Sequence, residues 1–427
     1  MRTRFVLSVA VSDLISLALS CAVASQIVFG TWLPWDALLT SPVWPMLTFM
    51  VLSMVTVSIV TEQMSGPGVP RPTYGRMVTI WMGTGFLTAV LLVLFRDVYF
   101  SRAFFAFSML GWLVPATLHR IVRRRRPWTE RFGVITNEKE LADDLNEADH
   151  AQVEWVLDPG ADSPSELPDR DLTVAVDLRA VLSESMARYL SSCDVAGYTI
   201  RPFSSIYEEH TGRVPLIHLS EGWEISAPLL EVAHWLPAKR VVDMVLTLVT
   251  APLWIALGAI IGAYVKIVDR GPAIFKQNRV GLNGGVFTMY KFRTMHGDAE
   301  REGARFASHG DPRLIRGGSF LRRSRLDEIP QLWNVLIGDM TIVGPRAEQV
   351  PFVSEFRSQI PFYDHRHMVR PGITGWAQVN YGYADDEAET IEKLTYDLYY
   401  IKHMSPVMDL RIFWKSIWTV LTGAGAR

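Results

Sequence analysis

Cysteine is scarce in this chain of 427 residues, which contains only Cys21 and Cys193. Two cysteines are too few for a disulfide framework, and neither lies at a metal-ligand spacing, so we expect the chain to function in a reducing compartment. The formal net charge is −2, which gives no indication of a nucleic-acid partner. The sequence also lacks G-x-x-x-x-G-K-[ST] and G-x-G-x-x-G motifs, which excludes a P-loop enzyme and a standard dinucleotide-binding fingerprint.

Long apolar segments, by contrast, are abundant: hydrophobic residues make up 49% of the chain, and its mean hydropathy is +0.15. Four apolar stretches near the N-terminus approach the ~20 helical residues that cross a bilayer core, and they show almost no polar face. We therefore predict four N-terminal transmembrane helices in a domain of residues 1–126. The stretches run over roughly Phe5–Phe29, Val43–Val60, Met77–Leu94 and Ala103–Leu118.

Basic residues predict the orientation of these helices. Arg2 and Arg4 precede the first span, and the loop after it has tryptophans at positions 32 and 35 but no lysine or arginine. The run Arg123-Arg124-Arg125-Arg126 follows the fourth span. Because cytoplasmic loops carry the excess of positive charge, we expect the N-terminus and everything after residue 126 to be cytoplasmic.

Residues 127–230 have the composition of a small soluble domain. Short β-type runs such as Phe132–Ile135 and Leu172–Asp177 alternate with helical patterns such as Leu182–Ser192. This alternation predicts a small parallel, Rossmann-like α/β domain. Its first strand-to-helix turn has no glycine that would let the backbone approach a pyrophosphate. We interpret the domain as non-catalytic, with a regulatory or dimerising role.

A fifth apolar stretch, Val241–Val268, follows Lys239 and Arg240 and contains Pro252 near its middle. Proline removes a helical hydrogen bond and clashes with the preceding turn, so a kink or break is expected there. Basic residues at both ends favour a re-entrant helix, residues 239–268, that enters and leaves the membrane on the cytoplasmic side. A kinked fifth span is the alternative, and it would place the following domain outside the cell.

From residue 271 onward the sequence is dense in short basic motifs that contain glycine and proline. Such clusters of arginine and lysine predict a site for a multiply charged anion, most often phosphate. A solvated or lipid-headgroup-binding basic face is the alternative. The candidate substrate- and phosphate-binding residues in these motifs include Lys291, Arg293, Gln331 and Arg370.

An adjacent acidic pair, Asp327-Glu328, lies among arginines in the motif L-R-R-S-R-L-D-E-I-P-Q at 321–331. Neighbouring arginines stabilise the ionised form of a carboxylate. Such a carboxylate can act as a nucleophile on phosphorus or as a ligand for a hard cation such as Mg²⁺. Structural ion pairing is the alternative. His365 and His367 form an H-x-H motif without acidic or cysteine partners at ligand spacing, so we do not expect a zinc site.

Together these motifs resemble those of the bacterial sugar transferase family, the polyprenyl-phosphate sugar-1-phosphate transferases. The resemblance is closest from Lys239 to Arg427 and includes G-D-M-T-I-V-G-P-R at 338–346 and R-P-G-I-T-G-W-A-Q-V at 370–379. Four spans followed by an α/β domain are similar to the layout of long-chain members, which include undecaprenyl-phosphate glucose-phosphate and galactose-phosphate transferases. The segment Lys393–Lys402 and the Gly-Ala-Arg end resemble the branch associated with exosortase-type exopolysaccharide systems.

The resemblance implies roles for individual residues in a membrane-associated catalytic domain of residues 231–427. Asp327 corresponds to the nucleophile and Glu328 to the Mg²⁺ ligand, and Arg322 and Arg346 correspond to arginines that hold phosphate. The start and the bend of the re-entrant helix correspond to Lys239, Arg240 and Pro252.

Three positions depart from the family pattern, and none touches the acidic pair. Ala251 replaces a serine before Pro252, so a hydroxyl that could satisfy freed backbone groups is missing. Ala347 replaces the second proline of Gly-Pro-Arg-Pro, and Ile315 replaces a common threonine.

The function implied by the resemblance is transfer of a sugar-1-phosphate from a UDP-sugar to undecaprenyl phosphate. UMP would be released through a covalent aspartyl intermediate, at the cytoplasmic face of the bacterial inner membrane, in a first membrane step of exopolysaccharide or other glycoconjugate synthesis. We expect membrane lipid to surround the apolar segments. The α/β domain suggests a homodimer. One alternative is a membrane glycosyltransferase that releases UDP. Another is a scaffold with an inactive C-terminal domain, against which the intact acidic pair argues.

Overall fold

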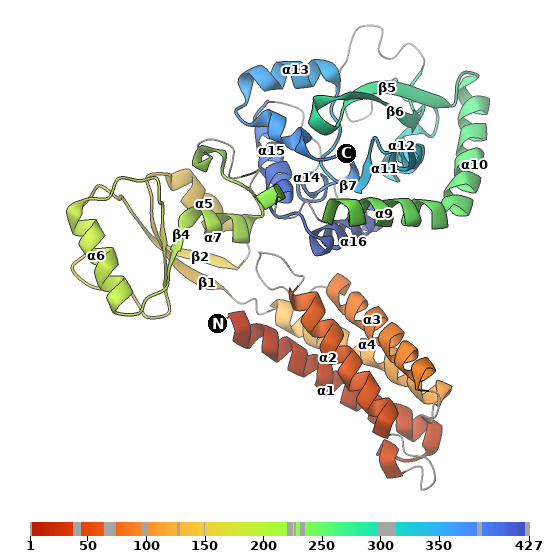
Figure 1. The fold of residues 1–427 in the computed structure, drawn as a ribbon, viewed down its shortest axis with the longest axis horizontal. Coiled ribbons are helices and arrows are strands. Elements are labelled where there is room, and N and C mark those ends of the chain that lie inside the picture. Colours follow the sequence, from red (N-terminus) through yellow and green to blue (C-terminus); the bar gives the residue numbers. More distant parts are fainter. Residues whose placement is uncertain are drawn as a thin grey trace. The chain divides into compact units, whose positions relative to one another are not determined.

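The computed structural model describes residues 2–36, 44–63, 74–95, 101–125, 129–148, 150–219, 225, 228–230, 235–296, 313–381 and 387–422 (Figure 1). Its contacts divide the chain into two compact units, Met1–Glu130 with Asp149–Gln152, and Arg131–Ala148 with Val153–Arg427. The predicted domain boundaries near residues 126 and 230 remain predictions. Val43, Arg126 and the Gly-Ala-Arg end lie outside the described residues.

The first unit is built from the four predicted N-terminal helices. In the described part of the chain, three of them and α10 of the second unit are long and apolar enough to cross a membrane. The apolar part of α2 is shorter, at Trp44–Ile59. The bounds are α1 Arg2–Phe29, α2 Trp44–Gln63, α3 Tyr74–Leu94 and α4 Arg102–Arg125, with a short 3₁₀ turn η1 at Pro34–Asp36.

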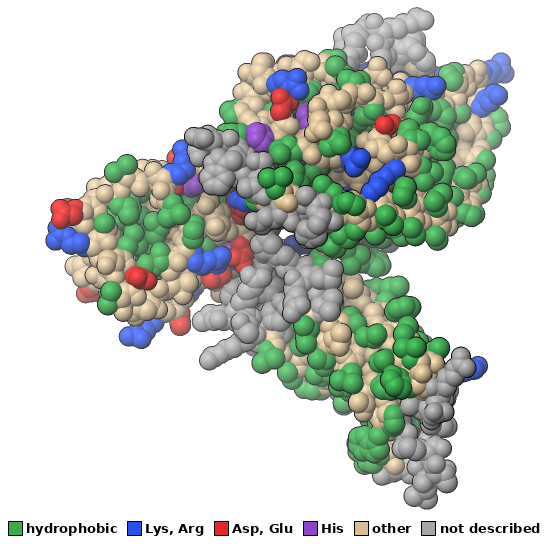
Figure 2. All heavy atoms as spheres, in the orientation of Figure 1, with side chains coloured by type: hydrophobic (Ala, Val, Ile, Leu, Met, Phe, Trp, Pro, Cys, Tyr) green, Lys and Arg blue, Asp and Glu red, His purple; other side chains and the backbone are tan. Residues whose placement is uncertain are grey.

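Polar side chains lie inside this bundle and apolar side chains cover it. The fully buried Arg120 of α4 donates to both carboxylate oxygens of Asp13 in α1, at 2.7 and 2.8 Å. Outward-facing side chains such as Phe86 and Leu94 are 72% and 70% exposed, and hydrophobic groups cover much of the visible bundle surface in Figure 2. This distribution fits helices surrounded by lipid, because a charge in hydrocarbon must find a partner inside the protein.

A four-stranded sheet in the order β2-β1-β3-β4 forms the α/β part of the second unit. β3 pairs in parallel with both β1 and β4. The helix α7, which the sequence patterns did not predict, follows β4 directly. The elements are β1 Glu130–Ile135, α5 Lys139–Glu147, β2 Ala151–Leu157, β3 Thr173–Val176, α6 Glu184–Val195, β4 Ile200–Pro202, α7 Phe203–Thr211 and the 3₁₀ turn η2 Leu216–His218.

The C-terminal part combines an antiparallel hairpin, β5-β6, with a small parallel pair, β7-β8, and short helices. The hairpin pairs Phe275 with Lys291, and β7 pairs Val343 with Thr374. The elements are β5 Ile274–Val280, η3 Leu282–Gly284, β6 Val286–Phe292, α11 Gly318–Arg323, η4 Leu326–Glu328, α12 Gln331–Ile337, β7 Thr341–Val343, α13 Val350–Gln359, η5 Tyr363–Met368, β8 Gly372–Thr374, α14 Trp376–Asn380, α15 Glu387–Lys402 and α16 Pro406–Thr422.

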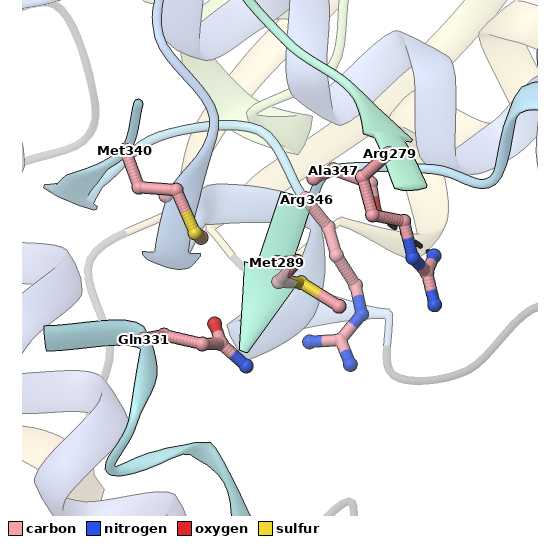
Figure 3. Close-up of a pocket in the computed structure, with 7 residues that line it drawn as sticks. Arg279, Met289, Gln331, Met340, Arg346 and Ala347 are labelled. Carbon is pink, nitrogen blue, oxygen red and sulfur yellow. Dashed lines mark hydrogen bonds between the residues drawn. The ribbon is translucent and has the colours of Figure 1, made fainter. Parts of the chain in front are cut away.

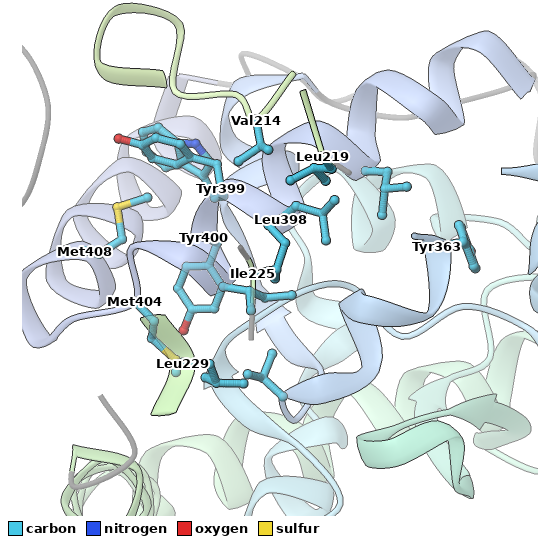
Figure 4. Packing of buried hydrophobic residues seen from close by; sticks show 14 of the residues in the cluster. Val214, Leu219, Ile225, Leu229, Tyr363, Leu398, Tyr399, Tyr400, Met404 and Met408 are labelled. Atoms are coloured by element: carbon cyan, nitrogen blue, oxygen red, sulfur yellow. The ribbon is translucent and has the colours of Figure 1, made fainter. Parts of the chain in front are cut away.

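The core of this part includes a segment from the end of the α/β region. Val214 and Leu219 belong to the same buried cluster as Leu398 and Tyr399 of α15 (Figure 4). Next to it, Glu208 of α7 accepts hydrogen bonds from the α15 end, including one from Lys402 Nζ at 2.8 Å. The α/β and C-terminal parts therefore share buried apolar and ionic contacts within one unit.

The fifth apolar stretch forms two helices, α9 Trp235–Val249 and α10 Ala251–Asp269, which meet at a bend in Figure 1. Pro252 lies in the first turn of α10, where its missing N–H leaves no helical bond unmade. The carbonyl of Thr247 before the bend accepts a hydrogen bond from Trp254 Nε1 at 2.9 Å. The indole thus satisfies a carbonyl at the break, although Ala251 offers no hydroxyl there.

Candidate active site

The acidic pair lies on a tight turn between two short helices. Arg325 precedes this turn in the left-handed conformation, with φ 57°, and its carbonyl accepts a hydrogen bond from Glu328 N at 3.1 Å. A left-handed residue other than glycine costs on the order of 1–3 kcal/mol and is typical of functional sites. The turn carries both Asp327 and Glu328 into the interior, where they are 7% and 5% exposed.

Three cationic side chains converge on one oxygen of Glu328. Oε1 lies 3.0 Å from Arg346 Nη2, 3.4 Å from Lys291 Nζ and 3.5 Å from Arg325 Nη1. Burial by itself would raise the pKa of Glu328, but the three positive charges more than offset it and hold this pKa well below its usual range. Glu328 is therefore a permanent carboxylate at neutral pH.

Asp327 has a different environment from its neighbour. Its Oδ1 is buried and accepts no hydrogen bond from any part of the chain that the structure describes. Burial, together with the charge of Glu328, raises the pKa of Asp327 to about 6, while Lys291, Arg322 and Arg346 oppose this rise. Glu328 is thus paired with three cations, whereas Oδ1 of Asp327 has no hydrogen-bond donor among the described residues, and a carboxylate oxygen without such a partner keeps its lone pairs available for nucleophilic attack.

A pocket beside the pair collects further polar groups (Figure 3). The amide of Gln331 is buried, and its Nε2 has no hydrogen-bond partner among the described residues. Arg346 reaches the same pocket from the loop after β7. The pocket is lined by Arg279, Met289, Gln331, Met340, Arg346, Ala347 and Gly372.

The structure thus brings four of the predicted site residues close to Asp327, namely Glu328, Lys291, Arg322 and Arg346, and places Gln331 in the pocket that Arg346 also lines. Arg293 instead pairs with Asp269 at the end of α10, at 2.9 Å. Arg370 donates from Nε to the carbonyl of Gly338 at 3.0 Å.

The two basic residues at the start of α9 also find partners within the C-terminal part. Lys239 Nζ pairs with Asp409 of α16, and Arg240 donates to the carbonyls of Val335 and Leu336 at the end of α12. Together with Arg370 they line a second pocket. These residues therefore anchor α9 to the C-terminal part.

Two arginines near the site were not among the predicted site residues. Arg325 contacts Glu328, and Arg279 of β5 lines the pocket of Figure 3. A spacing of three residues between Arg325 and Glu328 was a local signal for the first contact. Nothing local indicated the second, because Arg279 reaches the pocket through the pairing of distant segments.

The H-x-H motif has no metal-site geometry in the described residues, which contain no group of three His, Cys, Asp or Glu side chains placed to hold a metal ion. Burial and the neighbouring Arg366 lower the pKa of His367 to about 4. Its Nδ1 lies 3.5 Å from Oδ1 of Asp364.

Comparisons with known proteins identify the family of this chain. The model of the family described as bacterial sugar transferase matches residues 234–423. UDP-N-acetylgalactosamine-undecaprenyl-phosphate N-acetylgalactosaminephosphotransferase from Aeromonas hydrophila is 43% identical over 279 residues, which are 65% of this chain and 65% of that protein. UDP-glucose:undecaprenyl-phosphate glucose-1-phosphate transferase from Xanthomonas campestris pv. campestris is 41% identical over 213 residues, 48% of this chain and 42% of that protein.

A third relative matches over most of its own length. The exopolysaccharide production protein PSS from Rhizobium leguminosarum bv. phaseoli is 39% identical over 164 residues, 37% of this chain and 82% of that protein. The chain belongs to the bacterial sugar transferase family. It spans 65% of the length of the Aeromonas relative and 42% of the Xanthomonas relative.

Proposed function

We propose that this protein transfers a sugar-1-phosphate from a UDP-sugar to undecaprenyl phosphate and releases UMP. The observation that carries the proposal is the buried Asp327-Glu328 pair, in which Glu328 is paired with cations and Oδ1 of Asp327 has no hydrogen-bond donor among the described residues. The names of two relatives give the same reaction class. They differ in the sugar, N-acetylgalactosamine in one and glucose in the other, so the donor is proposed as a UDP-sugar without a choice between them.

The proposed chemistry consists of two displacements at one phosphorus atom. The Asp327 carboxylate attacks the phosphorus that bears the sugar, the bond from this phosphorus to the bridging oxygen breaks, and UMP leaves with the electron pair. An oxygen of the polyprenyl phosphate then attacks the same phosphorus, which restores the carboxylate and gives the lipid diphosphate sugar. Arg346 and Lys291 lie where they can neutralise phosphate charge in both steps.

Magnesium fits the donor groups at this site. Mg²⁺ is commonly held by one or two carboxylates together with substrate phosphates and water. The cations around Glu328 contact Oε1, which leaves Oε2 for a metal, and Oδ1 of Asp327 has no hydrogen-bond donor among the described residues. When bound, the ion would reduce the negative charge on the phosphates.

The fall of kcat/KM at acid pH should follow the protonation of Asp327. With a pKa raised to about 6, the side chain gains a proton as the pH falls through that value and loses its nucleophilicity. Burial and the charge of Arg346 lower the pKa of Lys291 to about 8, so this side chain loses its positive charge as the pH rises through 8. We therefore expect kcat/KM to be highest between these two values.

Replacing Lys291 with Arg isolates the alkaline limb. An arginine stays protonated throughout this range, so the variant should keep its kcat/KM from about pH 8 to pH 10 while the wild type loses roughly tenfold per pH unit. The profile of each variant is normalised to its own maximum. An alkaline limb that is identical in Lys291→Arg and wild type would assign that limb to another group.

We also propose that α9 and α10 form a re-entrant helix that keeps the site at the cytoplasmic face of the bacterial inner membrane. Both ends of this segment contact the same C-terminal part: Lys239 pairs with Asp409, and Tyr264 donates to the carbonyl of Arg316 at 2.9 Å. Between these ends, side chains such as Val249 and Leu253 are 73% and 71% exposed and suit a lipid surrounding. These contacts favour a segment that returns to the side it entered.

Cysteine labelling tests this topology. In a Cys21- and Cys193-free background, single cysteines at positions 235 and 285 should both resist an impermeant thiol reagent in intact cells and react after permeabilisation. A cysteine at Leu33, in the loop predicted to lie outside, is the positive control. Labelling of position 285 but not 235 from outside would make the segment a fifth span and contradict the proposal.

The α/β part is proposed to be a degenerate Rossmann-like domain with a regulatory or dimerising role. In such folds, ligands bind where the strand order reverses, here between β1 and β3. At this position Thr136 Oγ1 donates to Asp177 Oδ2 at 3.1 Å. The residue that follows β1 therefore contacts the residue that follows β3 directly. This contact and the missing glycine motif support a role other than nucleotide binding.

The nucleotide product tests the proposed reaction against the glycosyltransferase alternative. Membranes that contain the protein are incubated with undecaprenyl phosphate, Mg²⁺ and a panel of radiolabelled UDP-sugars, and both lipid product and nucleotide are scored. UMP in a 1:1 ratio to lipid-linked sugar is expected for at least one donor. UDP as the sole nucleotide product would reject phosphosugar transfer.

A further inference from the structure

The loop that carries Arg346 is held at four successive backbone carbonyls. Two of the donors are backbone N–H groups, and two are arginine side chains, one of which is visible beside Ala347 in Figure 3. The contacts are Gly372 N to Pro345 O at 2.8 Å, Arg366 Nη2 to Arg346 O at 3.1 Å, Arg279 Nη1 to Ala347 O at 3.0 Å and Val280 N to Glu348 O at 3.0 Å.

This loop has little intrinsic restraint at its centre. The ring of Pro345 fixes its own φ, but Arg346 and Ala347 have no such limit. Strand β7 ends at Val343 and helix α13 begins at Val350, and the residues between are paired only by isolated β-bridges, Arg346 with Gly372 and Gln349 with Arg279. Their conformation therefore depends on contacts from other segments.

Arg366, the central residue of the H-x-H motif, supplies one of these contacts from the interior. Its side chain is 3% exposed, and its Nη1 donates to the hydroxyl of Tyr363 at 2.8 Å. Its Nη2 lies 2.8 Å from Asp397 Oδ2 and also donates to the carbonyl of Arg346. Because a guanidinium is planar and its N–H directions are fixed, the first two contacts determine where the third points.

We propose that Arg366 is a positioning residue for Arg346. By holding the carbonyl of Arg346, it keeps the side chain of the same residue within 3.0 Å of Glu328 and beside the phosphate that reacts at Asp327. This role rests on the proposed function of the site. Arg366 itself lies behind the loop and touches no reacting group.

A double-mutant cycle between Arg366 and Arg346 tests the proposal. Arg366→Lys keeps the positive charge beside Asp397 but cannot make all three contacts, so we expect kcat/KM to fall on the order of 10²-fold through misplacement of Arg346. We expect Arg346→Lys, which retains the positive charge, to keep measurable activity. In that background Arg366→Lys should cost less than about twofold, because the effects of coupled residues are not additive. Arg357→Lys, at an exposed ion pair with Asp364, is the matched control and should behave like wild type.

A second variant keeps the test decisive if Arg366→Lys fails to fold. Tyr363→Phe removes only the acceptor of Nη1, and its smaller loss of kcat/KM should also vanish in the Arg346→Lys background. If Arg366→Lys and Tyr363→Phe lowered kcat/KM by the same factor in the wild-type and Arg346→Lys backgrounds, and also lowered Tm, their role would be structural only. That result would overturn the proposal. The released nucleotide is identified in the same assay. Release of UDP would count against the proposed function. Release of UMP together with independent losses of kcat/KM in the two backgrounds would count against the role of Arg366 alone.

Discussion

Replacing Asp327 with Asn is expected to lower turnover by roughly three orders of magnitude or more, as removal of a catalytic nucleophile does. Asparagine keeps the size of the side chain but cannot attack phosphorus. Oδ1 of Asp327 accepts no hydrogen bond in the described part of the chain, so the change breaks no contact at that atom, and membrane insertion should be unaffected. The measurement is lipid-linked sugar formed per amount of inserted protein.

The matched control for this variant is Asp364→Asn, which changes an exposed aspartate of the same domain that pairs with Arg357 at 2.8 Å. It should keep the activity of the wild type. If Asp327→Asn retained more than about a tenth of wild-type turnover, Asp327 would not be the nucleophile.

Replacing Glu328 with Gln should have the second largest effect, and it should reduce both turnover and stability. The neutral amide removes the carboxylate on which Lys291, Arg325 and Arg346 converge and leaves Asp327 as the neighbouring negative charge for Lys291 and Arg346. Breaking a buried ion pair by removing one partner costs about 3 kcal/mol of the free energy of unfolding or more. Loss of a hard ligand should also raise the Mg²⁺ concentration needed for half-maximal activity by on the order of tenfold or more.

Titration of Mg²⁺ against activity, with Tm measured in the same preparation, separates the two effects of Glu328→Gln. Glu355→Gln, at an exposed position of α13, is the control and should change neither quantity. Chelation of divalent metal should abolish wild-type activity. If the Glu328→Gln variant needed the same Mg²⁺ concentration for half-maximal activity as the wild type, Glu328 would be excluded as a metal ligand.

Features that depend on neighbouring residues were predictable from the sequence. The lengths of the apolar stretches indicated the N-terminal helices, and Pro252 indicated the break between α9 and α10, because proline acts on its own turn. The acidic pair stood out since Asp327 and Glu328 are adjacent and lie between arginines that are also close in sequence.

Features that depend on packing of distant segments were not predictable in the same way. Arg293 and Arg370 are in motifs as basic as that of Arg346, yet their side chains turn to Asp269 and to the carbonyl of Gly338. Only the fold decides which arginine of a basic motif faces the acidic pair. The buried contact of Asp13 with Arg120 across 107 residues is a further example, because each residue alone interrupts an apolar helix.

The central claim is that the sugar-phosphate passes through Asp327, and isotope transfer tests it most directly. The protein is incubated with UDP-sugar labelled with ³²P at the β-phosphorus, first without polyprenyl phosphate and then with an excess of it. We expect label on the peptide that contains Asp327, none on the Asp327→Asn variant, and transfer of the label to lipid when the acceptor is added. Lipid product that forms at the full rate without any labelled protein, in reactions quenched within one turnover, would contradict the covalent route and this account of the site.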